Sequence, residues 1–262
     1  MKAIILAAGQ GSRMKYLTKD KPKCLIEFLG MTLIERQIEN FLSCDISDII
    51  IVTGYMSEKI DFSEFKKIRN ANYASTNMVE SLFCSRKYWD QEIIVSYGDI
   101  VYEKDVLQKL IESQHAISVV VDMKGLSYFK ERFGFDFLSK TESLIFAEDG
   151  TVLNIGAPSP STEEVNAQYI GLLKFTLDGI KVLTSTYDTD KVYYKDNPWM
   201  RSKNFKNGYM TDMIQRIIDK GYEVNPVKIE GGWLEFDSVE DYSKYIEWHE
   251  SDKLSDYYDI NR

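Results

Sequence analysis

The feature that most constrains the fold is an apolar run near the N-terminus that ends in two glycines. Residues Ile4 to Arg13 read I-I-L-A-A-G-Q-G-S-R. An apolar run of this kind is typical of a buried strand, and the turn after it can present backbone amides to a phosphate. Gly9 and Gly11 allow the backbone to approach a ligand closely, and Arg13 offers a fork of donors for phosphate oxygens. The segment therefore predicts a strand followed by a polyphosphate-binding loop.

Two better-known phosphate loops do not fit this segment. The dinucleotide fingerprint requires a third glycine three residues after the second, where this chain has Met14. The Walker loop requires Gly-Lys-Ser or Gly-Lys-Thr, which the sequence lacks. We also expect no secretory signal, because the apolar residues 3–8 are too few and polar residues follow at once. An ordinary strand-to-helix turn is the remaining alternative.

Composition narrows the possible partners. The formal net charge of −9 disfavours binding to nucleic acid or to an anionic membrane, because both reward a basic surface. Cys24, Cys44 and Cys84 are widely spaced without a C-x-x-C motif, which favours reduced thiols in a cytoplasmic protein. His115 and His249 are too few and too far apart for a zinc site.

Apolar and amphipathic segments alternate along the chain, which predicts an α/β fold. We expect strands over 48–53, 92–97, 116–122, 168–175, 222–229 and 233–237. We expect helices over 33–42, 76–89, 103–113, 209–220 and 238–249, with Thr76 as a possible N-cap of the second.

Two parts of the chain differ from this alternation. Residues 124–165 are rich in aromatic residues, charges and short turns, and Glu148-Asp149-Gly150 is a plausible hairpin turn. We interpret this stretch as an inserted β lid that could cover a site, and residues 238–262 as a C-terminal helix and tail. Aromatic residues expected to be exposed at Tyr193, Tyr194 and Trp199 leave room for a homodimer contact.

Two aspartates are candidates for metal binding. Asp99 follows a core strand, at the edge where open α/β sheets bind ligands. Asp237 ends the segment Trp233–Asp237, and alternation places Glu235 on the same face. Either aspartate could instead cap a helix. Together they could hold Mg²⁺, which prefers oxygen ligands and leaves positions for water and substrate phosphate.

Two further polar segments have both a functional and a structural interpretation. In Lys21-Pro22-Lys23, the proline stiffens the turn, so Lys23 could face the same phosphates; a solvated basic pair is the alternative. The run 72–77, with Ser81 beyond it, contains asparagines that can read a base edge or a ribose hydroxyl. An Asx-type turn with a threonine cap is the simpler interpretation of that run.

Taken in order, these segments resemble the nucleotidyltransferases that activate sugar phosphates and amino-alcohol phosphates. The family signature L-A-A-G-x-G-S-R followed by K-P-K stands at residues 6–13 and 21–23, and the two metal-carboxylate segments stand at 98–100 and 233–237. Residues 72–82 look like the phosphocholine cytidylyltransferase branch. Residues 96–102, 167–172 and 209–211 look closest to the phosphoglutamine type of capsule modification. Met78 departs from the choline-type pattern, and we assign no cluster of aromatic residues to a choline cage.

The resemblance implies a single Rossmann-like domain over residues 1–262, with a doubly wound, mixed and mostly parallel sheet. It also implies a Mg²⁺-dependent cytidylyltransferase in a bacterial cytoplasm, which joins CTP to a phosphoglutamine-like, phosphocholine-like or phosphonate acceptor and releases pyrophosphate.

The resemblance also implies roles for individual residues. The catalytic residues would be Arg13, Lys23, Asp99 and Asp237, the last two as metal ligands. The nucleotide would contact the glycine loop, the turn after the next strand and the asparagine-rich run: Leu6, Ala7, Ala8, Gly9, Gly11, Ser12, Gly54, Tyr55, Asn72, Thr76, Asn77 and Ser81. The acceptor would contact Glu235, Gln168 and Tyr169.

Three alternatives remain open. A uridylyl- or thymidylyltransferase acting on a sugar 1-phosphate would use the same chemistry. A metal-dependent glycosyltransferase is disfavoured, because Asp99-Ile100-Val101 lacks the usual Asp-x-Asp. A catalytically silent nucleotide-binding module would keep the loop without the reaction.

Overall fold

The structure is a computed structural model, and it describes residues 1–158, 161–195 and 197–260. A mixed seven-stranded sheet forms the centre of this part of the chain. The strand order is β12-β8-β11-β6-β1-β4-β5. Neighbouring strands run parallel except at β11, which is antiparallel to both β6 and β8. The strands, in chain order, are β1 (Lys2–Ala7), β4 (Ile49–Thr53), β5 (Lys66–Arg69), β6 (Ile93–Tyr97), β8 (Ile117–Asp122), β11 (Gln168–Phe175) and β12 (Asn225–Ile229). The predicted mostly parallel α/β sheet is confirmed.

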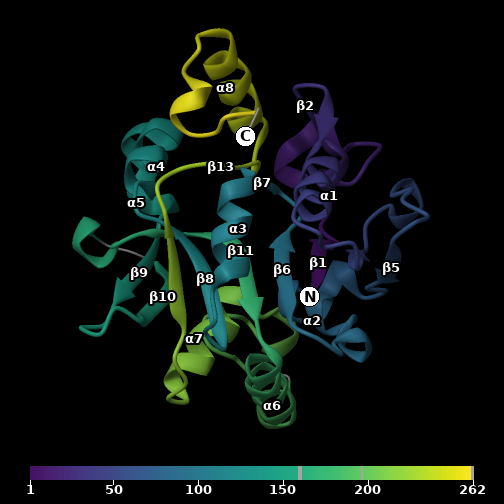
Figure 1. Cartoon of the computed structure of the whole chain (residues 1–262), viewed down its shortest axis with the longest axis vertical. Helices are drawn as coiled ribbons and strands as arrows, with labels where there is room; N and C mark the ends of the chain where they lie inside the picture. The colour runs from purple at the N-terminus through teal and green to yellow at the C-terminus, as the bar shows by residue number, and fades with distance from the viewer. Residues whose placement is uncertain (159–160, 196, 261–262) are drawn as a thin grey trace.

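Alternation along the central strands gives the sheet two apolar faces. In β1, Ala3 and Ile5 belong to one buried cluster, and Ile4 and Leu6 belong to the other. Because both faces of these strands must be buried, helices cover both sides. The first cluster packs against α1 (Leu33–Ser43), α3 (Lys104–Glu112) and α8 (Val239–Glu250), and the second against α2 (Met78–Phe83), α6 (Leu177–Tyr194) and α7 (Met210–Asp219). Figure 1 shows α8 and α6 at opposite ends of the molecule.

The helix after the asparagine-rich run is shorter than predicted. Its N-cap is Asn77, whose side-chain oxygen accepts a hydrogen bond from the Met78 amide, so the prediction of Thr76 as the cap is wrong. The Thr76 hydroxyl instead donates to the carbonyl of Asn72, which closes the preceding turn. The helix ends at Phe83, and a separate short turn covers Arg86–Tyr88.

The insertion combines helices with the predicted hairpin. It contains α4 (Gly125–Phe133), α5 (Phe137–Lys140), β9 (Glu142–Phe146) and β10 (Val152–Pro158). The hairpin turn at 148–150 is confirmed, and Gly150 has a positive φ of 87°. The helices were not predicted, because α4 is positioned by contact with a distant strand. A Cβ on Gly125 would lie 2.2 Å from the Cβ of Gln168, so the glycine allows α4 to begin against β11.

Two aromatic predictions have different outcomes. Tyr193 is exposed, as expected, but Trp199 is fully buried and its indole N–H donates to Asp190 at 2.9 Å. Trp199 therefore cannot form the surface contact predicted for it. Helix α6, which carries Asp190, was not predicted. Residues 261–262 of the predicted tail lie outside the described residues. Among the helices in the described ranges, none is long and apolar enough to cross a bilayer.

Candidate active site

The glycine loop leaves β1 at the edge of the sheet and turns at Gly11. Gly11 has a φ of +67°, a conformation that side chains rarely adopt. A Cβ at this position would also lie 2.9 Å from the Cβ of Lys23. The Thr18 hydroxyl donates to the Gly11 carbonyl at 3.0 Å and so holds the turn. The loop therefore needs glycine at position 11 both for its backbone and for the close packing of Lys23.

The ammonium group of Lys23 lies between the two predicted metal ligands. Its Nζ is 2.6 Å from Asp99 Oδ2 and 3.1 Å from Asp237 Oδ1, and the side chain is 12% exposed. Burial alone would lower the pKa of Lys23, but the charges of Asp99 and Asp237 outweigh burial and raise it. Arg13, whose side chain is 70% exposed, donates to Asp237 at 2.9 Å. All four predicted catalytic residues thus meet at one point.

Strand pairing explains why Asp99 and Asp237 meet. The Gly98 amide donates to the Leu6 carbonyl at 3.0 Å, which places Asp99 beside the end of β1. Short strands β7 (Ile100–Tyr102) and β13 (Trp233–Glu235) then pair antiparallel; β7 begins directly after Asp99, and β13 ends two residues before Asp237. The Phe236 amide donates to the Asp99 carbonyl at 2.9 Å and completes this connection.

A buried arginine lies behind the carboxylates. Arg132 of α4 is fully buried and contacts Glu235 at 2.6 Å, Asp241 at 2.7 Å and Asp237 at 3.6 Å. Burial and repulsion from Asp237 raise the pKa of Glu235 to about 7. Burial would also raise the pKa of Asp237, but Lys23, Arg132 and Arg13 outweigh burial and lower it. The sequence gives no local signal for Arg132, because its partners are more than a hundred residues away.

The carboxylates fit a divalent cation that also contacts the substrate. Asp99 Oδ1 is buried and has no hydrogen-bond partner, although buried oxygens normally have one. The described residues contain no group of three or more His, Cys, Asp or Glu side chains arranged as a complete metal site. Mg²⁺ commonly uses one or two carboxylates together with water and phosphate oxygens. Asp99 and Asp237 therefore suit an ion that is shared with a phosphate.

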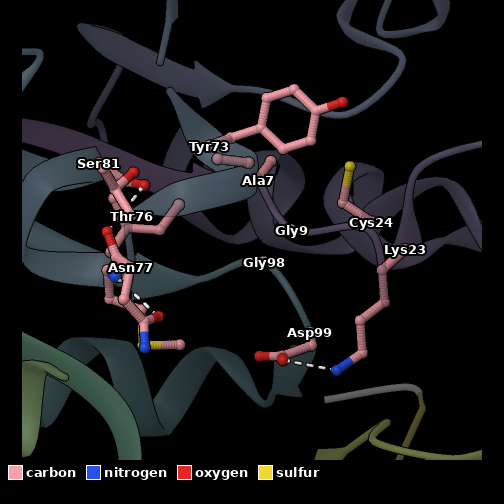
Figure 2. Close-up of a pocket in the computed structure, with 13 residues that line it drawn as sticks. Ala7, Gly9, Lys23, Cys24, Tyr73, Thr76, Asn77, Ser81, Gly98 and Asp99 are labelled. Carbon is pink, nitrogen blue, oxygen red and sulfur yellow. Dashed lines mark hydrogen bonds and ion pairs between the residues drawn. The ribbon is translucent and has the colours of Figure 1, made fainter. Parts of the chain in front are cut away.

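A first cavity of about 130 Å³ lies between the glycine loop and α2 (Figure 2). Lys23 and Asp99 stand on one side of it, and Thr76, Asn77 and Ser81 stand on the other. Nine of the predicted site residues line this cavity: Leu6, Ala7, Ala8, Gly9, Lys23, Thr76, Asn77, Ser81 and Asp99. Cys24, Tyr73, Met78 and Gly98 also line it and were not predicted.

Three residues predicted to contact the nucleotide line neither this cavity nor the larger one that adjoins it. Gly54 is packed too tightly, because a Cβ there would lie 2.5 Å from the Ala8 carbonyl oxygen. The ring of Tyr55 packs edge-on against Tyr73. Asn72 faces a different cavity beside α6. The asparagine-rich run makes a tight turn that directs Thr76 and Asn77 inward and leaves Asn72 outside.

A second, larger cavity of about 480 Å³ adjoins the first through Gly9, Lys23 and Asp99. Gly11, Ser12 and Arg13 line its phosphate-loop end, together with Glu235 and Asp237. It is also lined by the predicted residues Gln168 and Tyr169 and by Phe129, Lys140 and Glu142 of the insertion, which was expected to cover a site. Tyr97, Tyr209 and Thr211 line it as well and were not predicted as site residues. Tyr97, Phe129, Tyr169 and Tyr209 thus bring four aromatic rings to one cavity, a cluster that could not be assigned from the sequence.

Comparison with known proteins agrees with this geometry. Residues 3–131 match the family model described as MobA-like NTP transferase domain. The chain is 36% identical over 261 residues to CTP:phosphoglutamine cytidylyltransferase of Campylobacter jejuni, covering 94% of this chain and 100% of that protein. It is 29% identical to choline-phosphate cytidylyltransferase of Streptococcus pneumoniae, covering 94% of this chain and 97% of that protein.

A solved structure shows the same arrangement of elements. The CTP:phosphocholine cytidylyltransferase of Streptococcus pneumoniae superposes with a TM-score of 0.68 at 25% identity, covering 94% of this chain and 97% of that one. The likeness therefore extends well beyond the N-terminal half of the chain.

Proposed function

Because the chain belongs to the nucleotidyltransferase family that includes CTP:phosphoglutamine cytidylyltransferase, we propose that it is a Mg²⁺-dependent cytidylyltransferase. Its substrates would be CTP and a small phosphorylated polar metabolite, and its products would be a CDP-linked compound and pyrophosphate. The observation that carries this proposal is the position of Lys23, held between Asp99 and Asp237 where the two cavities join.

The first cavity suits the nucleoside of CTP. Asn77 and Ser81 offer hydrogen-bonding groups on the α2 side, and amides of the glycine loop lie at the opposite wall. The triphosphate would then extend along Gly9 and Gly11 toward Arg13 in the second cavity. The acceptor would enter from the end that contains Gln168 and Tyr169.

The reaction forms one P–O bond and breaks another. An oxygen of the acceptor phosphate attacks the α-phosphorus of CTP, while the bond to the β-phosphate breaks and pyrophosphate leaves with the electron pair. A phosphate oxygen is already nucleophilic at neutral pH, so no general base is required. Catalysis then consists of positioning the groups in line and neutralising charge.

Lys23 is placed to neutralise charge between the two substrates, and Arg13 to bind the leaving pyrophosphate. Asp99 and Asp237 would hold the Mg²⁺ ion, whose positive charge would offset that of the triphosphate. Arg132 keeps Glu235 and Asp237 in fixed orientations from behind.

A cytoplasmic location and a homodimer also belong to the proposal. Cys24, Cys44 and Cys84 are free thiols, which supports a reducing compartment. Tyr193 and other exposed aromatic residues leave surface for a second copy.

The test is pyrophosphate release by the purified full chain with Mg²⁺, each of the four NTPs in turn, and a pool of small phosphorylated metabolites. We expect release with CTP alone, and mass spectrometry of the CDP-linked product would identify the acceptor. Asp99→Asn serves as the inactive control, and Asp61→Asn, an exposed aspartate, as the matched active one.

Two results would replace the proposal. Release with UTP or dTTP and a sugar 1-phosphate would assign the protein to the sugar-activating nucleotidyltransferases. Binding of CTP without release from any acceptor pool would favour a nucleotide-binding module.

A further inference from the structure

A buried asparagine, Asn70, connects two hydroxyl groups on the α2 side of the first cavity. Asn70 directly follows β5 and was not predicted as a site residue. Its side-chain nitrogen Nδ2 donates to Thr76 Oγ1 at 2.9 Å and to Ser81 Oγ at 3.0 Å. Thr76 and Ser81 both line the cavity, whereas Asn70 does not (Figure 2). Asn70 can therefore influence a bound ligand only through these two hydroxyls.

The orientation of the Asn70 side chain is fixed by a backbone donor. Its Oδ1 accepts a hydrogen bond from the Asn72 amide at 2.9 Å, and a backbone N–H can only donate. The other end of the side chain must therefore be the NH₂ group, whose two hydrogens match the two hydroxyl oxygens. The backbone of Asn70 is held as well, because its amide donates to the Thr53 carbonyl at 2.8 Å and its carbonyl accepts from the Tyr73 amide at 3.3 Å. Asn70 is thus a fixed donor.

Both hydroxyl groups already give their single hydrogen to a backbone carbonyl. Thr76 Oγ1 donates to the Asn72 carbonyl at 3.0 Å, and Ser81 Oγ donates to the Asn77 carbonyl at 3.2 Å. A hydroxyl has one hydrogen and two lone pairs, and Asn70 occupies one lone pair of each oxygen. Toward a ligand, Thr76 and Ser81 can therefore accept a hydrogen bond, but neither can donate one without breaking a bond that it already makes.

We propose that Asn70 is a positioning residue that makes this cavity selective for a base with an exocyclic amino group, and so for CTP over UTP. The inference rests on the proposed function, because the base must lie against α2 for Thr76 and Ser81 to contact it. The 4-amino group of cytosine has two hydrogens and can donate to both oxygens. Uracil has a carbonyl oxygen at the same place, which would face lone pairs and find no donor.

Asn77 lines the same wall and does not distinguish the two bases. Its Oδ1 accepts from the Met78 amide at 2.9 Å, and its Nδ2 donates to the Asn207 carbonyl at 3.3 Å. These two bonds fix the orientation of the side chain and leave it one hydrogen and one lone pair, so it can serve either an amino group or a carbonyl. The preference therefore depends on Thr76 and Ser81.

The test compares three triphosphates that differ only in the base. They are CTP, UTP and the triphosphate of pyrimidin-2-one riboside, which lacks the 4-amino group but keeps N3 and O2 of cytosine. Each is titrated calorimetrically into the full chain with Mg²⁺ and without an acceptor. We expect CTP to bind about tenfold or more tightly than the pyrimidin-2-one analogue, which leaves buried acceptors without a donor. UTP should bind no more tightly than the analogue.

Variants assign the preference to individual residues. Asn70→Leu keeps a side chain of similar size but frees both hydroxyls to turn their hydrogens toward the ligand, so the ratio of CTP to UTP affinity should fall close to one. Ser81→Ala removes one acceptor, so it should reduce the preference for CTP over the analogue and leave the affinity for the analogue within about twofold.

Asn40→Leu is the matched control. Asn40 of α1 donates through Nδ2 to the Tyr102 carbonyl, away from the cavity, so its loss should lower the melting temperature and leave the affinity ratios unchanged. A purely structural role for Asn70 would weaken the binding of all three triphosphates alike, whereas the proposed role changes their ratio.

The outcomes separate this inference from the proposed function. Equal affinity of the wild type for CTP and the analogue overturns the inference, as does a wild-type ratio of CTP to UTP affinity in Asn70→Leu. If Asn70→Leu does not fold, an unchanged preference for CTP over the analogue in Ser81→Ala overturns it instead. Pyrophosphate release from CTP in any of these cases leaves the proposed cytidylyltransferase standing. If none of the three triphosphates binds with Mg²⁺, the proposed function fails, and the inference fails with it.

Discussion

Arg132 donates through Nε and Nη2 to the two carboxylate oxygens of Asp241, at 2.7 and 2.9 Å. Both side chains are buried. Asp241 also accepts hydrogen bonds from the amides of Asp237 and Ser238 at the start of α8. The pair therefore fixes α4 of the insertion to the segment that carries Asp237, the second of the proposed catalytic aspartates.

Replacing Arg132 should destabilise the protein strongly. Arg132→Met leaves the Asp241 carboxylate buried without a counter-charge, so we expect a loss of about 3–5 kcal/mol in the free energy of unfolding. Urea denaturation monitored by tryptophan fluorescence measures it. Lys181→Met breaks an exposed ion pair with Asp178 and should leave the free energy of unfolding nearly unchanged, because solvent screens such a pair. Equal losses in the two variants would contradict a structural role for the buried pair.

Replacing Asp99 should affect the reaction and leave the fold intact. Asp99→Asn removes the charge of one of the two carboxylates beside Lys23, and we expect kcat to fall by about 10²-fold or more. Steady-state pyrophosphate release gives the rate, and far-UV circular dichroism checks the fold. Turnover equal to that of the exposed-site variant Asp61→Asn would remove Asp99 from the catalytic residues.

Two glycine substitutions separate backbone strain from displacement of Lys23. Gly11 and Gly30 both have positive φ, so alanine at either should cost about 1 kcal/mol or more of stability. At Gly30 the new Cβ meets open space, whereas at Gly11 it meets the Lys23 side chain. We therefore expect Gly11→Ala to lower kcat well below that of Gly30→Ala. Similar kcat values would show that the packing of Lys23 against the loop is unimportant.

The acceptor affinity should depend on the ionisation of Glu142. Limited hydration and repulsion from Asp212 raise the pKa of this carboxyl to about 7, although the positive charge of Arg201 acts to lower it. Tyr97 and Tyr169 also face the Glu142 carboxyl. As the pH rises from 6 to 8, the carboxylate forms, so KM for an ammonium-bearing acceptor should fall. Glu142→Gln should lack this change. The acceptor phosphate also titrates with pH, but it does so equally with both proteins, so it does not account for a difference between them.

The raised pKa of Glu142 also predicts how the stability of the fold changes with pH. Ionisation of this carboxyl should favour acceptor binding but destabilise the folded protein. A carboxyl whose pKa is higher in the folded than in the unfolded protein favours the folded state when protonated, so ionisation destabilises the fold. The penalty grows as the pH rises from about 4.3, the unfolded value, through about 7. Thermal melts should therefore show Glu142→Gln gaining in Tm relative to wild type as the pH increases across this window. A constant Tm difference would contradict the raised pKa.

Residues governed by local pattern were predictable from the sequence. The apolar run before Gly9 indicated β1 and its loop, and strand ends placed Asp99 and Asp237 at one edge. Asn72 could not be placed, because the direction of its turn depends on the hydrogen bond between Thr76 and the Asn72 carbonyl.

Residues governed by distant contacts were not predictable. Arg132 looks like an ordinary helical charge until α8 is packed beside it. Glu142 looks like a solvated hairpin residue until β9 is placed opposite β11. Helix α6 combines threonines, tyrosines and charges without a clear apolar stripe, so its burial against the sheet, rather than its pattern, stabilises it.

The antiparallel direction of β11 has a consequence for how such an enzyme can diverge. Because β11 runs against β6, its first residues, Gln168 and Tyr169, lie at the edge where β6 ends. The insertion leads into that start and so brings its own residues to the cavity proposed for the acceptor. The cavity proposed for the nucleotide is built around β1, β6 and α2, which come earlier in the chain. Substitutions in the one continuous stretch that runs from the insertion into β11 can therefore change which metabolite receives the nucleotide, while the residues proposed to carry out the transfer stay the same.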